Sequence, residues 1–530
     1  MNNEYINPVI YADYSDPDVI RTGEDYYMTA SSFSNVPGLP VLHSKNLVSW
    51  ELIGYALEKL PDRKYFRPQP GCGVWAPAIR YHEGHYYIFF PMPDEGIFAV
   101  RSADPYGPFE EPVKVYDGAG FIDPCPLWDG DKAYLVCAVA KSRIGFQNVL
   151  YMFEMDPDSL KLISGPVKVY EGGDENPVTE GPKLYKKDGY YWIFAPAGGV
   201  KTGWQLAMRS KDIFGPYEAR TVMKQGTTGV NGPHQGAWVT DTKGGDWFVH
   251  FQDVFAAGRI THLEPMSWKD GWPVIGKDTG KGYGEPVLSW KCPPGEDIQP
   301  AADGLTDNNG KLSDSWQWNA QPQSSFYSVK DGGIVLNAIP ADERTAISDL
   351  PNLLLRKWDA PEFSASFEIY VNDLAEGSIA GLVNYGINSF GLFVKRTKDG
   401  LDIFSFEDRQ SFICGCVFTK ETINKVATVE MTDKLNFLYK VECSNSVTAT
   451  SPKPEALYGK ESTVIHPEER VYIKVIREGA EAASYSSVAA AGRWVGCKYG
   501  PFCANRLNVK KITQFVCDFS TIFVAHFTKE

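Results

Sequence analysis

Short runs of aromatic and β-branched residues alternate with Gly, Pro, Asn and Asp turns along most of the 530-residue chain. Turn residues recur about every 8–12 positions, and this spacing is typical of antiparallel β-sheets. Apolar residues at the period of an amphipathic helix are nearly absent. The pattern therefore predicts an all-β protein.

One short pattern occurs five times in the N-terminal half: a Gly or acidic turn, then paired aromatic residues and an apolar run. Its copies are centred on Tyr26, Tyr86, Tyr134, Tyr190 and Trp247. A second pattern follows, a strand that leads into a polar turn and an aromatic residue, and it is weaker in the third and fifth copies. Five small sheets that cannot bury both faces alone predict a five-bladed β-propeller. A β-sandwich with chance internal similarity is the alternative.

The composition changes near residue 290, where the chain becomes rich in Pro, Gly and Asp and reads KCPPGEDIQPAADGLTDNNG. Such a stretch is typical of a linker. The fivefold pattern stops there, while alternating strands such as FSASFEIYV and VYIKVIR continue. We therefore predict a propeller over residues 1–290, a linker over 291–304 and a β-sandwich of the jelly-roll kind over 305–530.

The formal net charge of −14 argues against nucleic acid and anionic membranes as partners. No apolar run reaches the length of about 18 residues that a membrane-spanning helix needs. The N-terminus lacks the basic and apolar regions of a signal peptide. We expect a cytoplasmic protein if Met1 is native, and a secreted or periplasmic one if a signal peptide has been removed.

The ten cysteines lie between Cys72 and Cys517 and form no CxxC pair. Cys414 and Cys416 are separated by one residue, which is the wrong spacing for a zinc site. We expect buried free thiols, and unpatterned thiols favour a reducing compartment.

A chemically distinctive residue precedes each aromatic pattern by a similar distance: Asp16, Trp75, Asp123, Glu180 and His234. If the aromatic pattern marks the second strand of a blade, these residues lie on the first strand, which lines the central channel. Buried like charges cost free energy unless they bind a ligand, share protons or accept hydrogen bonds. We therefore expect three carboxyls, a Trp and a His to converge on one axial cavity.

Two carboxyls on either side of a glycosidic bond are the usual device for its hydrolysis. One must stay protonated near neutral pH to protonate the leaving oxygen, and the other must stay ionised to deprotonate water. A third carboxylate nearby raises the pKa of the acid by repulsion and orients it. Three converging acids would supply all of these roles.

Longer stretches around these residues resemble glycoside hydrolase family 43, among them YSDPDVIRTGEDYYMTASSF, GVWAPAIRYHEGHYYIFF, FIDPCPLWD, TEGPKLYKKDGYYWIF and GPHQGAWV. The region from LSDSWQWNAQPQSSFYSV onward resembles the concanavalin-A-like sandwich of β-xylosidases in this family. The resemblance implies a five-bladed propeller and an inverting mechanism. It makes Asp16 the general base, Asp123 the residue that tunes the acid, and Glu180 the general acid. Asp18 is the rival for the base.

The resemblance also implies residues that bind the sugar. Trp75 and Pro77 lie in the WAPA segment, whose Trp walls the sugar pocket. Phe33 resembles an aromatic residue that contacts the non-reducing sugar, and Arg259 resembles an Arg that reaches a sugar hydroxyl. Gln235 is a further candidate beside His234. The structural alternatives are a core role for Trp75 and a surface ion pair for Arg259.

His234 resembles the His on the propeller axis and is counted with the sugar-binding residues. In some relatives this His helps to hold a central calcium ion, usually through waters. Calcium prefers oxygen ligands, so a lone imidazole is a poor ligand for it. We expect that no cofactor is required, and the resemblance leaves a water-mediated calcium ion near His234 open.

The expected activity is exo-acting release of terminal β-D-xylose from xylo-oligosaccharides, of α-L-arabinofuranose from arabinose-decorated hemicellulose, or of both. The sandwich favours a β-xylosidase, whereas SSFSNVPGLPVL departs from the bulkier aromatic segment of strict xylosidases. Strict α-L-arabinofuranosidase, endo-arabinanase and a non-catalytic carbohydrate-binding propeller are the alternatives, together with a propeller that is only a scaffold. The expected partners are hemicellulose-derived oligosaccharides, and homo-oligomerisation is left open.

Overall fold

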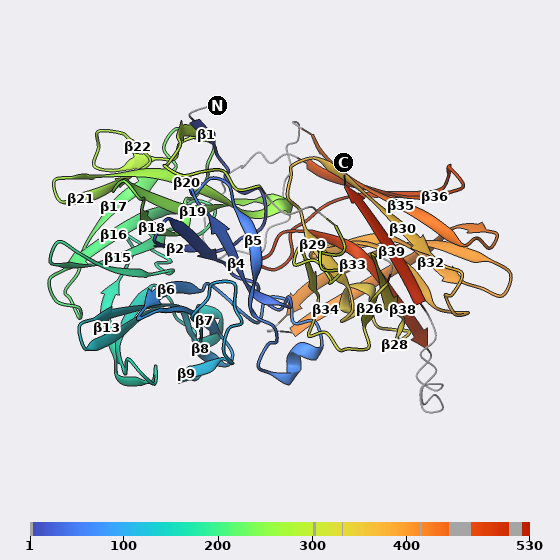
Figure 1. Ribbon diagram of the computed structural model, residues 1–530, viewed down its shortest axis with the longest axis horizontal. Coiled ribbons are helices and arrows are strands. Elements are labelled where there is room, and N and C mark those ends of the chain that lie inside the picture. The colour runs from blue at the N-terminus through green and yellow to red at the C-terminus, as the bar shows by residue number, and fades with distance from the viewer. Residues whose placement is uncertain are drawn as a thin grey trace. The chain divides into compact units, whose positions relative to one another are not determined.

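The computed structural model describes residues 4–299, 304–330, 332–413, 416–444, 468–507 and 522–529. The chain divides into two compact units. The first comprises Met1–Val254, Gly258–Ala302 and Gln317–Gln321, and the second comprises Phe255–Ala257, Asp303–Trp316 and Pro322–Glu530. In the described part of the chain nearly all regular structure is β-strand, as predicted (Figure 1).

Five antiparallel sheets in the first unit are the predicted blades. The first blade is β2 (Asp18–Thr22), β3 (Asp25–Thr29), β4 (Gly38–Ser44) and β5 (Glu51–Leu57). The second is β6 (Ala78–His82), β7 (His85–Met92), β8 (Gly96–Ser102) and β9 (Val113–Asp117). The third is β10 (Phe121–Asp129), β11 (Lys132–Val139), β12 (Val149–Met155) and β13 (Leu162–Glu171).

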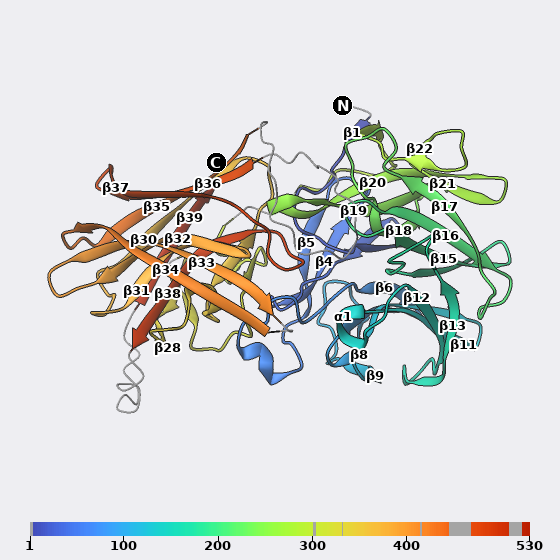
Figure 2. The same cartoon turned by 180° about the vertical axis from the view of Figure 1, so that it is seen from behind.

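The fourth blade is β14 (Lys183–Lys187), β15 (Tyr190–Ala197), β16 (Trp204–Ser210) and β17 (Glu218–Lys224), extended by β23 (Gly284–Glu285) and β22 (Lys277–Asp278). The fifth is β18 (His234–Thr240), β19 (Asp246–Val254), β20 (Gly258–Lys269) and β21 (Trp272–Ile275). A four-residue helix, α1 (Lys141–Ile144), follows β11 and is visible in Figure 2.

Every copy of the aromatic pattern falls on the second strand of a blade, which confirms that prediction. These strands are buried almost throughout, as in β7, because neighbouring blades cover both of their faces. A strand buried on both faces has a continuous apolar run instead of an alternating one. The first strands contact one another from β18 through β2, β6 and β10 to β14. The fivefold pattern is therefore the sequence signature of the blades.

The two ends of the propeller segment meet on the fifth blade. Strand β1 (Glu4–Ile6) pairs with β24 (Ser289–Lys291) in a separate two-stranded sheet. Asn7 donates hydrogen bonds of 2.8 Å to the carbonyl oxygens of both Leu263 and Val287. These bonds hold the N-terminal strand and the end of the propeller segment against β20.

The second unit contains two large sheets. One has the order β26 (Tyr327–Lys330), β27 (Gly333–Asn337), β39 (Ile522–Lys529), β30 (Phe363–Tyr370), β35 (Lys434–Ser444), β36 (Glu468–Arg477) and β37 (Ala480–Val488). The other has the order β25 (Trp316–Trp318, of which only Trp316 belongs to this unit), β29 (Leu354–Lys357), β38 (Lys498–Leu507), β31 (Ile379–Tyr385), β32 (Asn388–Arg396), β33 (Leu401–Ile413) and β34 (Cys416–Val429). Strand β28 (Ile339–Asp342) pairs with β38. Burial alternates strictly along β30 and β36, so one face of their sheet packs on an apolar core. This is the predicted β-sandwich.

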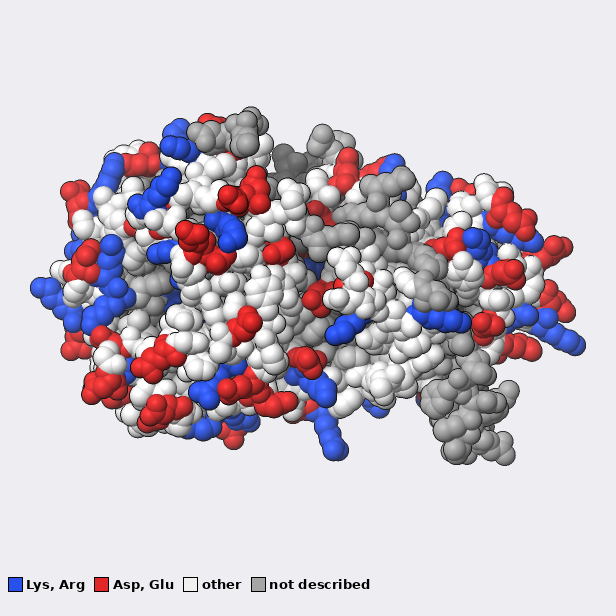
Figure 3. All heavy atoms as spheres, viewed as in Figure 1, with Lys and Arg blue, Asp and Glu red and all other residues white. Residues whose placement is uncertain are grey.

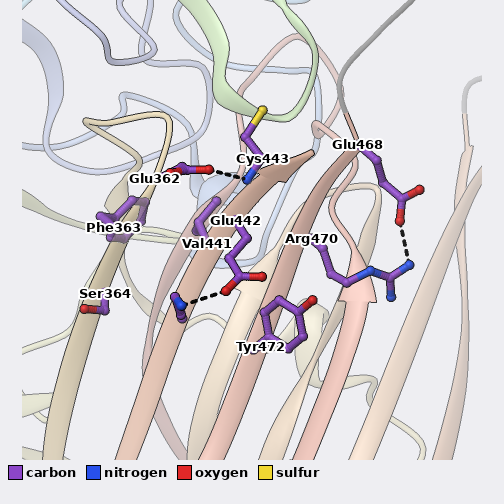
Figure 4. A pocket seen from close by; sticks show the side chains of 10 residues that line it. Glu362, Phe363, Ser364, Val441, Glu442, Cys443, Glu468, Arg470 and Tyr472 are labelled. Carbon is purple, nitrogen blue, oxygen red and sulfur yellow. Dashed lines mark hydrogen bonds and ion pairs between the residues drawn. The ribbon is translucent and has the colours of Figure 1, made fainter. Parts of the chain in front are cut away.

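A hollow of about 510 Å³ lies on the sheet formed by β30, β35 and β36 (Figure 4). Tyr472 contributes an aromatic ring to its lining. Four of the charged side chains around it form two ion pairs, Lys440 with Glu442 at 2.6 Å and Arg470 with Glu468 at 2.5 Å. The fifth, Glu362, accepts a hydrogen bond of 3.1 Å from the Cys443 amide, so the lining has one acidic side chain in excess.

The seven cysteines whose side chains are described are free thiols. Cys125, Cys137, Cys497 and Cys503 are buried, and the other three are half-buried. Cys414 and Cys517 lie outside the described residues, and only the backbone of Cys416 is described.

Acidic and basic side chains are interspersed over the described surface that Figure 3 shows. On this face the acidic side chains are therefore not gathered in one patch. In the described part of the chain, no helix has the length and apolar character needed to cross a membrane.

Candidate active site

The five residues that precede the aromatic patterns all lie at the start of the first strand of a blade. Asp16 comes two residues before β2, and Trp75 and Glu180 come three residues before β6 and β14. Asp123 lies within β10, where the pairing register shifts, and His234 is the first residue of β18. Because these strands contact one another around the ring, five segments that are distant in sequence share one end of the propeller.

Asp16 is buried and held by two donors. The Ser31 hydroxyl donates to its Oδ2 at 2.5 Å, and Arg259 Nη1 donates to its Oδ1 at 3.2 Å. Its backbone has a φ of 57°, in the left-handed region that non-Gly residues rarely adopt. A carboxylate that accepts from a guanidinium and a hydroxyl is held in a fixed orientation.

Asp18, the rival for the base, has a different environment. Its side chain is fully buried, and its Oδ2 accepts from the Ile79 amide at 2.8 Å and from Arg80 Nη1 at 2.7 Å. It therefore ties the first blade to the second. A regular strand would place both acids on one face, but the left-handed backbone at Asp16 lies before β2 begins and breaks that alternation. The structure thus gives Asp18 a structural role.

Asp123 is a buried carboxyl beside the backbone of the predicted acid. Its Oδ2 accepts a hydrogen bond of 2.8 Å from the amide of Gly181, the residue that follows Glu180. Burial raises the pKa of Asp123 to about 8, and the negative charges of Glu180 and Asp16 act in the same direction. The Gly181 amide and the charge of Lys183 oppose this rise. Mutual repulsion therefore disfavours the state in which Asp123 and Glu180 are both ionised.

Glu180 combines a fixed position with access to solvent. Its Oε1 lies 3.0 Å from Nε2 of His234, which is fully buried. The Glu180 side chain is 30% exposed, compared with 7% for Asp16. Gly181 has a φ of 57°, and a Cβ there would lie 2.7 Å from side-chain atoms of Gln235. A glycine is thus required behind the most exposed of the three carboxyls, and Gln235 packs against it.

Phe33 and Trp75 form the aromatic part of the site. Their ring centroids are 6.4 Å apart with the planes tilted by 54°. Phe33 has a φ of 52°, and the Arg143 guanidinium lies 5.0 Å from the centre of a Trp75 ring. A cation over the indole face stabilises the ring in one orientation. Trp75 is therefore held from one side by Arg143 and faces Phe33.

Pro77 has a backbone contact. Its carbonyl oxygen accepts a hydrogen bond of 2.7 Å from Nζ of Lys183, which is fully buried. The same ammonium group lies 3.8 Å from Asp18 Oδ2. Lys183 thus brings a positive charge between the second and fourth blades, close enough to the acids to oppose the rise in the pKa of Asp123.

The guanidinium of Arg259 contacts Asp16 and is neither free nor part of a surface ion pair. It also lies 4.8 Å from the ring of Phe251, and the Arg259 amide donates to Asp13 Oδ1 at 2.9 Å. Asp253 pairs with Arg259 across β19 and β20. Burial raises the pKa of Asp253, and the Arg259 charge opposes that rise.

Four residues near the site were not singled out from the sequence: Ser31, Arg143, Lys183 and Asp253. The signal for Ser31 and Lys183 was their closeness in the chain to Phe33 and Glu180, in SSF and TEGPKL. Arg143 and Asp253 carry no local signal, because only the folded ring brings them to Trp75 and Arg259.

The imidazole of His234 does not fit a directly bound calcium ion. Its Nε2 is engaged by Glu180, its buried Nδ1 has no hydrogen-bond partner among the described residues, and calcium requires several oxygen ligands in place of a single nitrogen. Among the described residues, His234 belongs to no group of three ligand side chains that could hold an ion. A water-mediated ion stays a prediction, and no step below depends on one.

Residues 5–273 match glycosyl hydrolases family 43, and residues 307–521 match the beta xylosidase C-terminal concanavalin A-like domain. The chain belongs to glycosyl hydrolases family 43. The resemblance seen in the sequence is therefore confirmed, and the family and the sheets together confirm a five-bladed propeller followed by a sandwich.

Two relatives and one solved structure are similar to this chain. A protein of Xylanibacter ruminicola with the provisional name beta-xylosidase is 40% identical over 348 residues, 65% of this chain and 65% of that protein. A non-reducing end alpha-L-arabinofuranosidase of Bacteroides ovatus is 32% identical over 410 residues, 71% of this chain and 73% of the relative. A GH43 protein of Bacillus licheniformis has the same fold, with a TM-score of 0.77 at 24% identity and 99% of both chains covered. The chain thus spans just under two thirds of the length of the Xylanibacter relative.

Proposed function

We propose that this protein is an exo-acting, inverting glycosidase that releases terminal β-D-xylose or α-L-arabinofuranose from hemicellulose-derived oligosaccharides. The observation that carries the proposal is the contrast between the surroundings of the three carboxyls. Asp16 is held by a guanidinium and a hydroxyl, whereas Asp123 and Glu180 face each other's charge. Environments that drive neighbouring acids toward opposite protonation states distinguish a catalytic base from a catalytic acid.

In the proposed reaction Asp16 removes a proton from a water molecule as that water attacks the anomeric carbon. Glu180 gives its proton to the leaving glycosidic oxygen on the opposite face of the sugar. Inversion requires room for the water, so the two carboxyls should be about 6.5–9.5 Å apart. Asp123 acts through Glu180 in two ways. Its hydrogen bond with the Gly181 amide fixes the backbone next to Glu180, and repulsion between the two carboxyls disfavours the state in which both are ionised.

The remaining residues would bind the terminal pentose. We place the sugar ring against Trp75 and Phe33, whose rings lie close together. His234 would orient Glu180, and Arg259 would orient Asp16 while its remaining donors reach a sugar hydroxyl. The names of the relatives support both pentoses, since one is called a beta-xylosidase and the other an alpha-L-arabinofuranosidase.

A side-by-side assay tests this proposal. Purified protein is given nitrophenyl β-D-xyloside and nitrophenyl α-L-arabinofuranoside, and kcat/KM is measured for each. Turnover of at least one of them, reduced by about 10²–10⁴-fold in Glu180→Gln and Asp16→Asn, is expected. If neither these substrates nor xylo- and arabinoxylo-oligosaccharides are cleaved, the protein is a carbohydrate-binding propeller and the proposal is wrong.

Strict α-L-arabinofuranosidase activity is the second candidate. The segment SSFSNVPGLPVL, which carries Phe33, favours it because it is less bulky and aromatic than expected for a strict xylosidase. Turnover of the arabinofuranoside alone in the same assay would select this candidate over the broader one.

A further inference from the structure

Three buried ligand-type side chains lie together on one face of the fifth blade, outside the carboxyl site. His250 in β19 is paired directly with His262 in β20, and Glu264 follows two residues later on the same strand. Because side chains alternate along a strand, the three project to the same side of the sheet. All three are buried, and one ligand atom from each lies within 4.8 Å of the other two.

The outer atoms of two of these groups are already engaged. Nδ1 of His250 lies 3.1 Å from the carbonyl oxygen of Phe251, to which it can only donate. Glu264 Oε2 accepts from the Val287 amide at 2.8 Å. These contacts direct His250 Nε2 and Glu264 Oε1, which are 3.2 Å apart, toward the centre of the group. Metal-binding imidazoles and carboxylates are commonly held in this way by a second set of hydrogen bonds.

A hydrogen bond between His250 and Glu264 would account for the burial of those two side chains. It does not account for His262. It is only 2% exposed, and neither of its ring nitrogens has a hydrogen-bond partner among the described residues. A buried polar group without a partner is costly, and such groups in native proteins call for an explanation. The imidazole stacks beside His250 with ring centroids 5.4 Å apart, which keeps a nitrogen next to the other two ligand atoms.

We propose that His250, His262 and Glu264 bind one divalent transition-metal ion of the zinc type. Two imidazoles and one carboxylate are a set that zinc accepts, whereas calcium and magnesium prefer oxygen alone. The ion has a structural role, because all three side chains are buried within the blade and, among the described contacts, none reaches the carboxyl site. It would fasten β19 to β20, the strand whose first residues include Arg259, and through Val287 it would hold the end of the propeller segment.

The test is the metal content and thermal stability of the full chain. Protein is loaded with Zn²⁺, dialysed against metal-free buffer and analysed by elemental mass spectrometry, and its unfolding is followed with Zn²⁺ or with EDTA. We expect about one zinc ion per chain and a lower unfolding temperature in EDTA. His262→Gln should lose the ion and its response to EDTA, whereas His85→Gln, on a different blade, should keep both.

Co²⁺ in place of Zn²⁺ gives a second measurement on the unmodified chain, which remains informative if His262→Gln does not fold. Visible absorption bands of a Co²⁺ ion bound by two nitrogen ligands and one carboxylate are expected. A wild-type chain that retains no metal and unfolds at the same temperature in Zn²⁺ and EDTA would overturn the proposal. Equal metal retention by folded His262→Gln would overturn it too, since the ion would then lie elsewhere.

Discussion

The strand starts of the propeller and the strands of the sandwich both contain buried acids, but in different surroundings. Asp408 of the sandwich is fully buried, and burial raises its pKa to about 7, with a further contribution from the charge of Glu421. Its Oδ2 accepts from the Ser348 amide at 2.8 Å. Asp123 has a pKa that burial raises in the same direction, and each of the two carboxyls lies near two further acids, Glu180 and Asp16 for Asp123 and Glu421 and Asp349 for Asp408. A raised pKa near other acids therefore does not by itself mark a catalytic carboxyl. The propeller site differs because it adds a partly exposed acid, Glu180, and the aromatic rings of Phe33 and Trp75.

Several residues at the propeller site have a left-handed backbone, which is a second difference from the strands of the sandwich. Asp16, Phe33, Asp123 and Gln235 have φ values of 57°, 52°, 55° and 40°. Non-Gly residues in this region are strained and gather at functional sites. Among the described residues of the sandwich strands, burial instead follows the simple alternation of β30 and β36. Left-handed backbone and converging carboxyls thus occur together at the strand starts of the propeller.

The largest expected effect is that of Asp16→Asn and of Glu180→Gln on turnover. General acid–base catalysis contributes about 10²–10⁴-fold, so kcat should fall by that order in each variant. Asp408→Asn is the matched control and should retain kcat within about twofold, because Asp408 belongs to a sheet of the sandwich and not to the strand starts of the propeller. The measurement is steady-state kinetics on the nitrophenyl glycosides. Comparable losses in Asp408→Asn and Asp16→Asn would remove the distinction between the two regions.

A smaller loss is expected for Arg259→Lys, which removes the guanidinium contact with Asp16 but keeps a positive charge. Misplacement of a catalytic group by about 1 Å can cost about 100-fold, so a decrease in kcat of roughly 10- to 100-fold should follow. Arg80→Lys is the control, because Arg80 holds Asp18 and should affect the unfolding temperature more than kcat. The reverse pattern would exchange the roles of Asp16 and Asp18.

Asp123→Asn tests the tuning of the acid through pH. Asp123 and Glu180 titrate as a pair, and the second proton leaves against the charge left by the first. Asn removes that charge, so the alkaline limb of the kcat/KM profile should move to lower pH. The same variant should change stability. The pKa of Asp123 is about 8 in the folded protein, against an ordinary value of 3.8 for the carboxyl, so the native state holds this proton more tightly than the unfolded chain between those pH values. Stability therefore falls as pH rises through that window.

Asn cannot lose a proton there, so Asp123→Asn should unfold at a higher temperature than wild type at pH 8 and at nearly the same temperature at pH 4. Thermal unfolding at the two pH values checks this. A variant that is less stable than wild type at pH 8 would mean that the charge of Asp123 is stabilised by Lys183 more than it is penalised by burial and Glu180.

The smallest expected effect is a change in KM, and it should distinguish Trp75 of the propeller site from Tyr472 of the sandwich. Trp75→Ala should raise KM for the nitrophenyl glycosides by about tenfold, roughly the 1.4 kcal/mol that one ring contact can supply. Tyr472→Ala, in the hollow of the sandwich, should leave KM for the same small substrates unchanged. An equal increase in both variants would place the small substrate on the sandwich as well.

The sequence was sufficient for the architecture and for the positions of the three acids at the strand starts, because each blade repeats the same buried second strand at a regular position. The catalytic roles of these acids stay a prediction. Asp16, Asp123 and Glu180 could be aligned through that repeat before any contact was known. The partners of these acids could not, since Arg259 lies in the fifth blade and Asp16 in the first. Nothing in the spacing of SDPD separated Asp16 from Asp18 either. The left-handed backbone at Asp16 and the contact of Asp18 with Arg80 are properties of the folded ring.

The anomeric configuration of the first product tests the central claim most directly. Proton NMR spectra recorded during the first minutes of hydrolysis of a β-xyloside or an α-arabinofuranoside show which anomer forms before mutarotation. Attack by water activated at Asp16, opposite Glu180, predicts the inverted anomer as the first product. Initial formation of the anomer with retained configuration would contradict the assignment of Asp16 as a base and require a nucleophile in its place.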